Sequence, residues 1–377
     1  MDKKYLSCRR FNGYKPCFPD HDCFTNGCRE HDPAGTRILI INLDAMGDVL
    51  MTTSQLPALK KKYPVSEIHW LTEKISAPLL LNNQYIDKVH VFSYESLLIL
   101  ENIEFDVAVN LDKSQKAASA LNKIKAEKKM GFGLSSTGKI IPVNEGAVYN
   151  YRLGMDDHLK FRVNTRTKTD YVAETMEIDY DRSDYVFKFT ENELEYIRNF
   201  RSLVGIRESD FVVGFNTGCS TLFPNKKMTV DQHIKLIQKF IDETNFRIML
   251  LGGPEDKERN EHINSAFSGK IINTPVSDGV RKGACYESLA DVIITGDSFG
   301  LHLGIALKKY TIVWFGLSCH TEIDLFDRGV KFYPRDLFCS PCWKKSCPYN
   351  LECVDMIDLD GMFRAAVDYY NNTRDKS

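Results

Sequence analysis

Short apolar runs alternate with longer, more polar stretches along the first half of the chain. The first run, residues 37–43, is too short for a typical helix and is rich in isoleucine, as is typical of a strand buried on both faces. Strands that alternate with helical lengths predict a parallel sheet. We expect four strands here, at residues 37–43, 68–72, 88–92 and 105–111.

The alternation weakens over residues 131–202, a polar stretch rich in charge and tyrosine, and it resumes at Phe211. Two such series of strands predict an α/β protein with two doubly wound domains that face each other. The second series is expected at residues 211–216, 246–251, 270–273, 291–295 and 310–315.

Two helices in the second half can be read from the pattern. Thr229 and Gln232 are placed to form a capping box at the start of one helix. A last helix is expected at residues 359–370, but its sequence does not indicate which domain it contacts. The first of these helices has an apolar face made of Val230, Ile234, Ile237 and Ile241.

The turn after the first strand contains a candidate catalytic carboxylate, Asp48, next to Gly47. Ligands of open α/β sheets bind outside the carboxyl ends of the strands, which favours a functional side chain at this point. The alternative is that Asp48 is only a helix N-cap. Pro57 is tolerated in the first turn of a helix, so we expect the main helix to begin near Ser54 and Asp48 to lie on a preceding short turn.

A polar turn after the strand at residues 211–216 is a candidate anion site. It begins with Thr217 and Gly218 and contains Lys226 and Lys227 before the capped helix. A lysine about 4 Å from a phosphate charge gains roughly 4 kcal/mol at an effective dielectric near 20, which would orient a diphosphate. Two solvated loop lysines are the alternative.

Two further strand ends in the second half carry candidate residues for binding a nucleotide. Glu255 or Asp256, after a pair of glycines, could accept hydrogen bonds from ribose hydroxyls. Asp297 and Ser298 begin an apolar helix, where free amides attract phosphate and Asp297 is better suited to sugar hydroxyls or to capping. His302, one turn further, is either a supporting donor or a histidine of the core.

Composition narrows the class of protein. The chain has 377 residues and is 43% hydrophobic, enough for two domains that each bury a core. Its 49 basic and 51 acidic side chains give a net charge of −2, which disfavours nucleic acid as the main partner. The N-terminus has no apolar core of a signal peptide, and no run approaches a membrane span. We expect a cytoplasmic protein, with contact to the inner face of the membrane left open.

Four of the eleven cysteines form a C-terminal cluster that begins with a CxxC pattern. In the cytoplasm such a cluster is better explained by metal binding than by disulfides. Four thiolates favour zinc or iron in a structural site, and no catalytic metal is expected. Free or disulfide-linked thiols are the alternative. The cluster consists of Cys339, Cys342, Cys347 and Cys353.

A second, more widely spaced group of cysteines precedes the first strand. It could bind a metal, belong to a flexible leader, or complete a site with the C-terminal cluster. Cys219, Cys285 and Cys319 are expected to be isolated. The N-terminal group consists of Cys8, Cys17, Cys23 and Cys28, with His21 and His31.

Four motifs in order resemble those of the bacterial heptosyltransferases, glycosyltransferase family nine. They are RILIINLDAMGDVLMTT, FNTGCSTLFPNKKMT, LLGGPEDKE and ADVIITGDSFGLHLGIAL, and the resemblance covers roughly residues 37–357. It implies a GT-B fold of two Rossmann-like domains with an active cleft between them. It also implies transfer of heptose from an ADP-heptose donor with inversion.

The resemblance extends to single residues. It implies that Asp48 is the general base and that Lys226 contacts the donor phosphate and sugar. It implies that Asp256 binds the donor ribose, although the neighbouring Glu255 could serve instead.

Asp297 and Ser298 match the family's acidic and hydroxyl pair, which holds the donor sugar and diphosphate. Three positions depart from the family's pattern. Phe299 replaces a usual glycine, Met228 a common tryptophan and Gly296 a common asparagine. These changes could alter the donor sugar without altering the fold.

The expected acceptor is a lipopolysaccharide core or a similar glycan, with glycolipid and protein acceptors left open. The cysteine cluster resembles that of autotransporter heptosyltransferases, which would imply a protein O-heptosyltransferase, iron, and a homo-oligomer. The expected organisation is a leader at 1–36, an acceptor domain at 37–203, a donor domain at 204–338, a four-cysteine finger at 339–357 and a helix at 358–377.

Two alternatives of other kinds stay open. One is a different GT-B enzyme that uses an ADP- or UDP-sugar. The other is a zinc-knuckle type of nucleic-acid-binding protein, because the cysteine spacing is near that of a knuckle and Trp343 is followed by Lys344 and Lys345.

Overall fold

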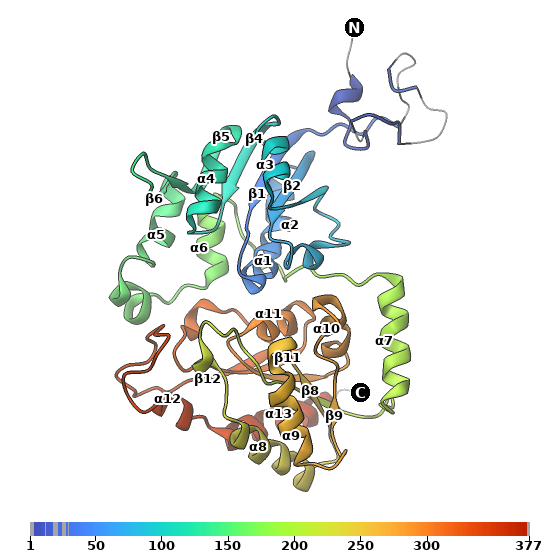
Figure 1. The fold of residues 1–377 in the computed structure, drawn as a ribbon, viewed down its shortest axis with the longest axis vertical. Helices are drawn as coiled ribbons and strands as arrows, with labels where there is room; N and C mark the ends of the chain where they lie inside the picture. Colours follow the sequence, from blue (N-terminus) through green and yellow to red (C-terminus); the bar gives the residue numbers. More distant parts are fainter. Residues whose placement is uncertain (1–3, 12, 18–21, 25–27, 29, 375–377) are drawn as a thin grey trace. The chain divides into compact units, whose positions relative to one another are not determined.

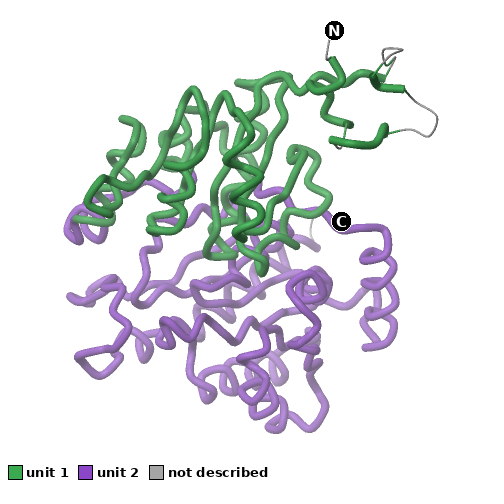
Figure 2. The backbone as a smooth tube through the Cα atoms, turned by 45° about the horizontal axis from the view of Figure 1, so that its top comes forward, with its two compact units in different colours: residues 1–155, 170–183 green, residues 156–169, 184–377 purple. Residues whose placement is uncertain are grey.

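The computed structural model describes residues 4–11, 13–17, 22–24, 28 and 30–374. The chain divides into two compact units, which Figure 2 distinguishes by colour. Unit 1 contains Met1–Met155 and Asp170–Ser183, and unit 2 contains Asp156–Thr169 and Asp184–Ser377. Unit 2 is therefore built from two separate stretches of sequence.

Unit 1 contains a six-stranded sheet in the order β3-β2-β1-β4-β5-β6 (Figure 1). The first five strands are parallel and β6 is antiparallel to β5. The four strands expected from the sequence are confirmed as β1 to β4. The strands are β1 Thr36–Ile41, β2 Ser66–Thr72, β3 Lys88–Val91, β4 Glu104–Asn110, β5 Lys125–Leu134 and β6 Ile140–Pro142.

The helices of unit 1 connect these strands, and among its described residues four further segments are helical turns of three or four residues. The turn Thr53–Gln55 joins the first two α-helices. The α-helices are α1 Met46–Thr52, α2 Leu56–Lys62, α3 Tyr94–Leu100, α4 Gln115–Lys123, α5 Val148–Arg152 and α6 Lys168–Thr175, the last of which crosses the limit between the units.

Unit 2 contains a second six-stranded sheet, entirely parallel, in the order β12-β11-β10-β7-β8-β9. The five strands expected from the sequence are confirmed as β7 to β11. The strands are β7 Val212–Asn216, β8 Arg247–Leu251, β9 Ile272–Asn273, β10 Val292–Gly296, β11 Tyr310–Trp314 and β12 Gly329–Phe332.

The two sheets share one topology. Counted from the first strand of each, both follow the order 3-2-1-4-5-6 of the doubly wound Rossmann fold. In such a sheet the direction of winding reverses between the first and fourth strands, and ligands bind beside their carboxyl ends. These switch points lie between β1 and β4 in unit 1 and between β7 and β10 in unit 2.

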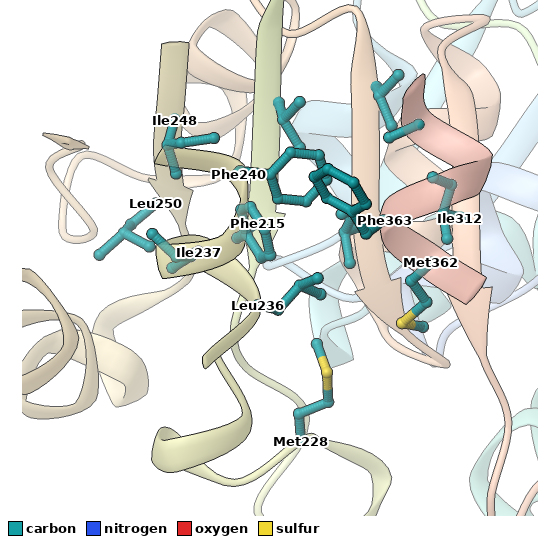
Figure 3. Packing of buried hydrophobic residues seen from close by; sticks show 14 of the residues in the cluster. Phe215, Met228, Leu236, Ile237, Phe240, Ile248, Leu250, Ile312, Met362 and Phe363 are labelled. Atoms are coloured by element: carbon teal, nitrogen blue, oxygen red, sulfur yellow. The ribbon is translucent and has the colours of Figure 1, made fainter. Parts of the chain in front are cut away.

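The last helix packs on unit 2, which the sequence alone left open. Met362 and Phe363 belong to the same buried cluster as Phe215 of β7 and Phe240 (Figure 3). The capping box of Thr229 and Gln232 is confirmed at the start of α8. The α-helices of this unit are α7 Glu191–Leu203, α8 Val230–Glu243, α9 Lys257–Ser265, α10 Val280–Glu287, α11 Phe299–Ala306, α12 Glu352–Asp355 and α13 Leu359–Arg374.

Within the part of the chain that the structure describes, no helix combines the length and the apolar character needed to cross a membrane.

Candidate functional site

Asp48 lies in the first turn of α1, immediately beyond the carboxyl end of β1. The sequence predicted that Asp48 would lie on a short turn ahead of the helix, and this was wrong. The structure has two short helices, α1 and α2, and Pro57 lies in the first turn of only the second. The N-cap of α1 is Ala45 rather than Asp48. The capping alternative is therefore excluded, and a half-buried carboxylate remains at the unit 1 switch point.

A second carboxylate, Asp112, lies at the same switch point and was missed by sequence reasoning. It follows β4, and its side chain is buried. Its carboxylate accepts hydrogen bonds from the Asn42 side chain at 2.8 Å and from the Leu43 backbone amide. The signal was present in the sequence, since Asp112 directly follows the strand expected at residues 105–111.

The pKa of Asp112 is raised to about 7. Burial is the main cause, because it disfavours the charged carboxylate, and the negative charge of Asp48 raises the pKa further. The hydrogen bonds from Leu43, Asn42 and Asp44 act in the opposite direction. The two carboxylates are therefore electrostatically coupled, and Asp112 also holds the backbone that leads from β1 to α1.

The switch point of unit 2 contains a lysine–carboxylate pair. Lys226 Nζ lies 2.7 Å from Asp297 Oδ2, and both side chains are about one-eighth exposed, at 12% and 13%. Burial would raise the pKa of Asp297, but the charge and hydrogen bond of Lys226, together with the charge of His302, lower it below its usual value. Asp297 is thus an ionised partner that holds Lys226 at the end of β10.

Ser298 is the N-cap of α11 and lies beside Asn216, the last residue of β7. The Asn216 side-chain amide donates to Ser298 Oγ at 2.8 Å. A Cβ atom at Gly300 would lie 1.9 Å from that amide nitrogen, so only glycine fits there. His302, one turn along α11, is buried and stacks on the Tyr185 ring at 6.2 Å, as a histidine of the core would.

The turns after β7 and β8 pack tightly against each other. Asp256 accepts a hydrogen bond from the Gly253 amide at 2.9 Å, and a Cβ atom at Gly218 would lie 1.9 Å from its carboxylate. Thr217 is buried and donates to Asn260 at 2.5 Å. Asp256 therefore stabilises its own turn, whereas the neighbouring carboxylate of Glu255 is exposed to solvent.

Two of the departures from the family's pattern have a structural explanation. A Cβ atom at Gly296 would lie 2.2 Å from the Lys226 carbonyl oxygen, so a glycine lets the lysine turn approach β10. Met228, just before the start of α8, belongs to the buried cluster of unit 2 and is labelled in Figure 3. Phe299, the third departure, is half-buried in the first turn of α11.

The four C-terminal cysteines line one cavity of about 280 Å³, together with Phe161 and other residues. Burial and then the three neighbouring thiols raise the pKa of Cys353 to about 11. This donor set suits a thiophilic cation, which would relieve the mutual repulsion of the thiolates. Among the described residues, however, no three Cys, His, Asp or Glu side chains are already grouped closely enough to hold a metal ion.

The N-terminal cysteines also influence one another. Burial and the thiols of Cys28, Cys17 and Cys8, in that order, raise the pKa of Cys23. His21 lies outside the described residues. Of the other three cysteines, which are expected to be isolated, Cys285 and Cys319 are buried and Cys219 is partly buried.

Comparison with known proteins adds a family match. The model of the family described as "Glycosyltransferase family 9 (heptosyltransferase)" matches residues 99–352. A curated protein, lipopolysaccharide heptosyltransferase 1 of Campylobacter coli, is 22% identical over 300 residues, which cover 75% of this chain and 84% of that protein.

Several solved structures share the fold. A family 9 glycosyltransferase from Veillonella parvula has a TM-score of 0.71 at 19% identity, over 88% of this chain and 96% of that one. The ADP-heptose lipopolysaccharide heptosyltransferase II of E. coli has a TM-score of 0.64 at 17% identity, over 89% and 100%. The dodecameric iron-containing heptosyltransferase TibC of E. coli, solved with ADP-D-beta-D-heptose, has a TM-score of 0.53 at 9% identity, over 89% and 77%. With the two sheets described above, these likenesses confirm the GT-B fold class.

Proposed function

This chain belongs to glycosyltransferase family 9, and we propose that it transfers heptose from ADP-heptose, with inversion, to a hydroxyl group of a lipopolysaccharide core or similar glycan. The proposal rests mainly on the side chains that lie at the two switch points. One holds the half-buried carboxylate of Asp48, and the other holds the ion pair of Lys226 and Asp297. A base and a cation are the two groups that such a transfer requires.

The donor side of the proposal rests on unit 2. Lys226 is available for the diphosphate, and the first amides of α11 at Ser298 add a favourable helix dipole. Asp297 would accept hydrogen bonds from the donor sugar. Of the two carboxylates proposed for the ribose, the exposed Glu255 is better placed than Asp256, which is already bonded to the Gly253 amide.

The proposed reaction is a direct displacement. Asp48 removes the proton from the acceptor hydroxyl while its oxygen forms a bond to the anomeric carbon of heptose. The bond between that carbon and the β-phosphate oxygen breaks at the same time, and ADP leaves with the electron pair on the opposite face. The configuration at the anomeric carbon is therefore inverted. Lys226 stabilises the negative charge that develops on the diphosphate.

The acceptor and the surroundings of the enzyme are further parts of the proposal. A lipopolysaccharide acceptor is supported by the function named for the Campylobacter coli relative, and it would bring a cytoplasmic enzyme to the inner face of the membrane. A protein acceptor is the second candidate, because the four-cysteine cluster also suits a protein O-heptosyltransferase; a glycolipid acceptor stays open. The dodecameric state of TibC supports a homo-oligomer.

We also propose that zinc or iron binds at Cys339, Cys342, Cys347 and Cys353 in a structural site. The common cavity supports this proposal, as does the iron named for TibC. The metal would hold the finger together and would take no part in the transfer.

The structure gives little support to the nucleic-acid alternative. Base stacking would require a free aromatic face, and the indole of Trp343 already contacts Lys226 at 4.0 Å and the Phe223 ring at 5.1 Å.

Replacing Asp48 by Asn tests the chemistry. We expect the variant to bind ADP as the parent does and to lose transfer by a factor of at least about 10². Calorimetry with ADP-, UDP- and GDP-sugars measures the donor preference, and product analysis measures the transfer. Asp44→Asn, at an exposed carboxylate of the same strand end, is the matched control. Equal transfer by the Asp48 variant and the parent would exclude Asp48 as the base.

A further inference from the structure

The four-cysteine segment, residues 339–353, reaches the donor lysine through a single aromatic residue. Trp343 lies between Cys342 and Lys344, and its indole ring centroid is 4.0 Å from Lys226 Nζ. The Phe223 ring packs edge-on against the same indole, with centroids 5.1 Å apart and planes at 85°. An ammonium group at this distance from an indole face is within the range of a favourable cation–π interaction.

The backbone fixes Trp343 in this position. The amides of Cys342 and Trp343 both donate to the Leu317 carbonyl oxygen, at 3.0 and 2.9 Å. Trp343 itself has φ +50°, a left-handed conformation that is uncommon for a bulky residue. Such a conformation persists only where the surrounding contacts enforce it, which indicates that the backbone from which the indole extends is held in place.

The start of the segment is also bonded to other parts of unit 2. Arg162 donates to the carbonyl oxygens of Ser340 and Phe338, at 2.7 and 2.8 Å. Ser340 Oγ donates to the Gly316 carbonyl oxygen at 2.5 Å. The loop after β11 and the stretch around Arg162 therefore define where Trp343 can lie.

These contacts leave Lys226 Nζ with one anionic neighbour and two aromatic ones, the indole of Trp343 at 4.0 Å and the more distant Phe223 ring at 5.6 Å. Asp297 supplies the compensating charge at 2.7 Å, and the indole of Trp343 covers the ammonium group. The Lys226 side chain is only 12% exposed. A diphosphate that arrives at this lysine competes with Asp297, whereas it does not compete with the ring. The indole thus keeps the ammonium group in place while its anionic partner changes.

We propose that Trp343 is a positioning residue for the donor diphosphate, which acts through Lys226, so that the four-cysteine segment forms part of the donor site. The inference rests on the proposed function, because that function assigns the diphosphate to Lys226. It gives the cysteine segment a part in substrate binding that is separate from its folding.

A second lysine near the same ring provides the internal control. Lys160 Nζ lies 5.1 Å from the Trp343 centroid and 3.8 Å from a carboxylate oxygen of Glu322. If the indole affected ADP binding only through general packing, Trp343→Leu would cause the same loss of ADP affinity whether Lys226 or Lys160 had been removed. A double-mutant cycle separates the two cases.

The experiment measures the dissociation constants of ADP and adenosine by calorimetry for the full-length protein. We expect Trp343→Leu to weaken ADP about tenfold and to leave adenosine, which has no phosphate, unchanged. Trp343→Phe keeps an aromatic face and should retain most of the affinity for ADP. In a Lys226→Met background, Trp343→Leu should cause no further loss, whereas in a Lys160→Met background it should still cause the full loss.

Three results would overturn the inference. Equal weakening of adenosine and ADP by Trp343→Leu would show a general structural effect. Losses that multiply in the Trp343→Leu, Lys226→Met double variant would show that the ring does not act through Lys226. If the parent protein bound adenosine but not ADP, both the proposed function and this inference would fail. That result needs only the parent protein, so it is distinguishable from a failure seen in the variants.

Discussion

Asp112 shows how the end of a neighbouring strand shapes a candidate catalytic residue. Its carboxylate accepts hydrogen bonds from the backbone of Leu43 and from Asn42, and the charge of Asp48 contributes to its raised pKa. A carboxylate in this position both orders the connection from β1 to α1 and responds to the ionisation of its neighbour. Two roles, structural and electrostatic, therefore meet in one buried group.

The raised pKa of Asp112 predicts a pH dependence of stability. Its folded pKa of about 7 exceeds the ordinary 3.8, so the stabilising contribution is complete below pH about 4 and is lost as the pH rises through about 7. Asp112→Asn has no such titration, so the free energy of unfolding of the parent should fall relative to that of the variant over this range, by about 4 kcal/mol at most. Denaturant unfolding from pH 4 to 8 measures it. A constant difference between the two proteins would contradict the assignment.

Gly296 provides a second test at the scale of one residue. Because a Cβ atom there would lie 2.2 Å from the Lys226 carbonyl oxygen, Gly296→Ala should lower the free energy of unfolding by about 2 kcal/mol and weaken ADP binding. Gly283→Ala is the matched control, since a Cβ atom at this position of α10 meets nothing within 4 Å. We expect the control to be neutral or more stable, because alanine favours a helix. Thermal and denaturant unfolding give the comparison.

Among the elements, the central strands were predictable from their apolar runs, whereas β5 and β12 were missed. β5 was missed because the first half of this strand is largely exposed and rich in lysine, and only the second half is buried. β12 was missed because it has four residues that are all half-buried at one end of its sheet. A strand that buries only part of one face carries no complete alternating pattern, so its pairing partner, rather than its own sequence, decides its conformation.

The same contrast applies to the candidate site. Asp48, Lys226, Asp297 and Ser298 could be named because each directly follows a recognisable strand or motif. The start of α1 could not be predicted from the sequence, since Pro57 indicates only the second of two short helices. The contact of Trp343 with Lys226 joins segments more than a hundred positions apart, and no local pattern encodes it.

The four-cysteine segment yields a prediction about metal content. Protein purified without added metal should contain zinc or iron, and Cys347→Ser should remove one ion per chain and lower the midpoint of thermal unfolding. Cys17→Ser, in the N-terminal group, should leave that ion in place. Elemental analysis of both variants counts the ions. Retention of the full metal content by the Cys347 variant would show that the Cys347 thiol is not needed to hold the ion.

At the scale of the whole molecule, the same 3-2-1-4-5-6 topology occurs twice, with a different chemical group at each switch point. The first switch point holds carboxylates, and the second holds a lysine with its counter-ion. A duplicated topology can thus carry different chemical groups at two equivalent positions.

Arg162 tests how firmly the separate stretch of unit 2 is integrated. Arg162→Gln removes a charged donor from the carbonyl oxygens of Phe338 and Ser340, and should lower the free energy of unfolding by about 1 to 2 kcal/mol. Arg364→Gln, at a side chain that is 65% exposed, should have almost no effect. Similar losses in both variants would indicate that these bonds add nothing beyond ordinary surface charge.

The discontinuous make-up of unit 2 also limits how such a gene can recombine. A chimera that joins the first 183 residues of one relative to the remainder of another would combine residues 156–169 of the first parent with a unit 2 from the second. Lys160 and Arg162 of one parent would then have to contact the cysteine segment of the other, with which their contacts did not evolve. Functional exchanges should therefore use three junctions, near residues 155, 169 and 183, so that both stretches of unit 2 are inherited together.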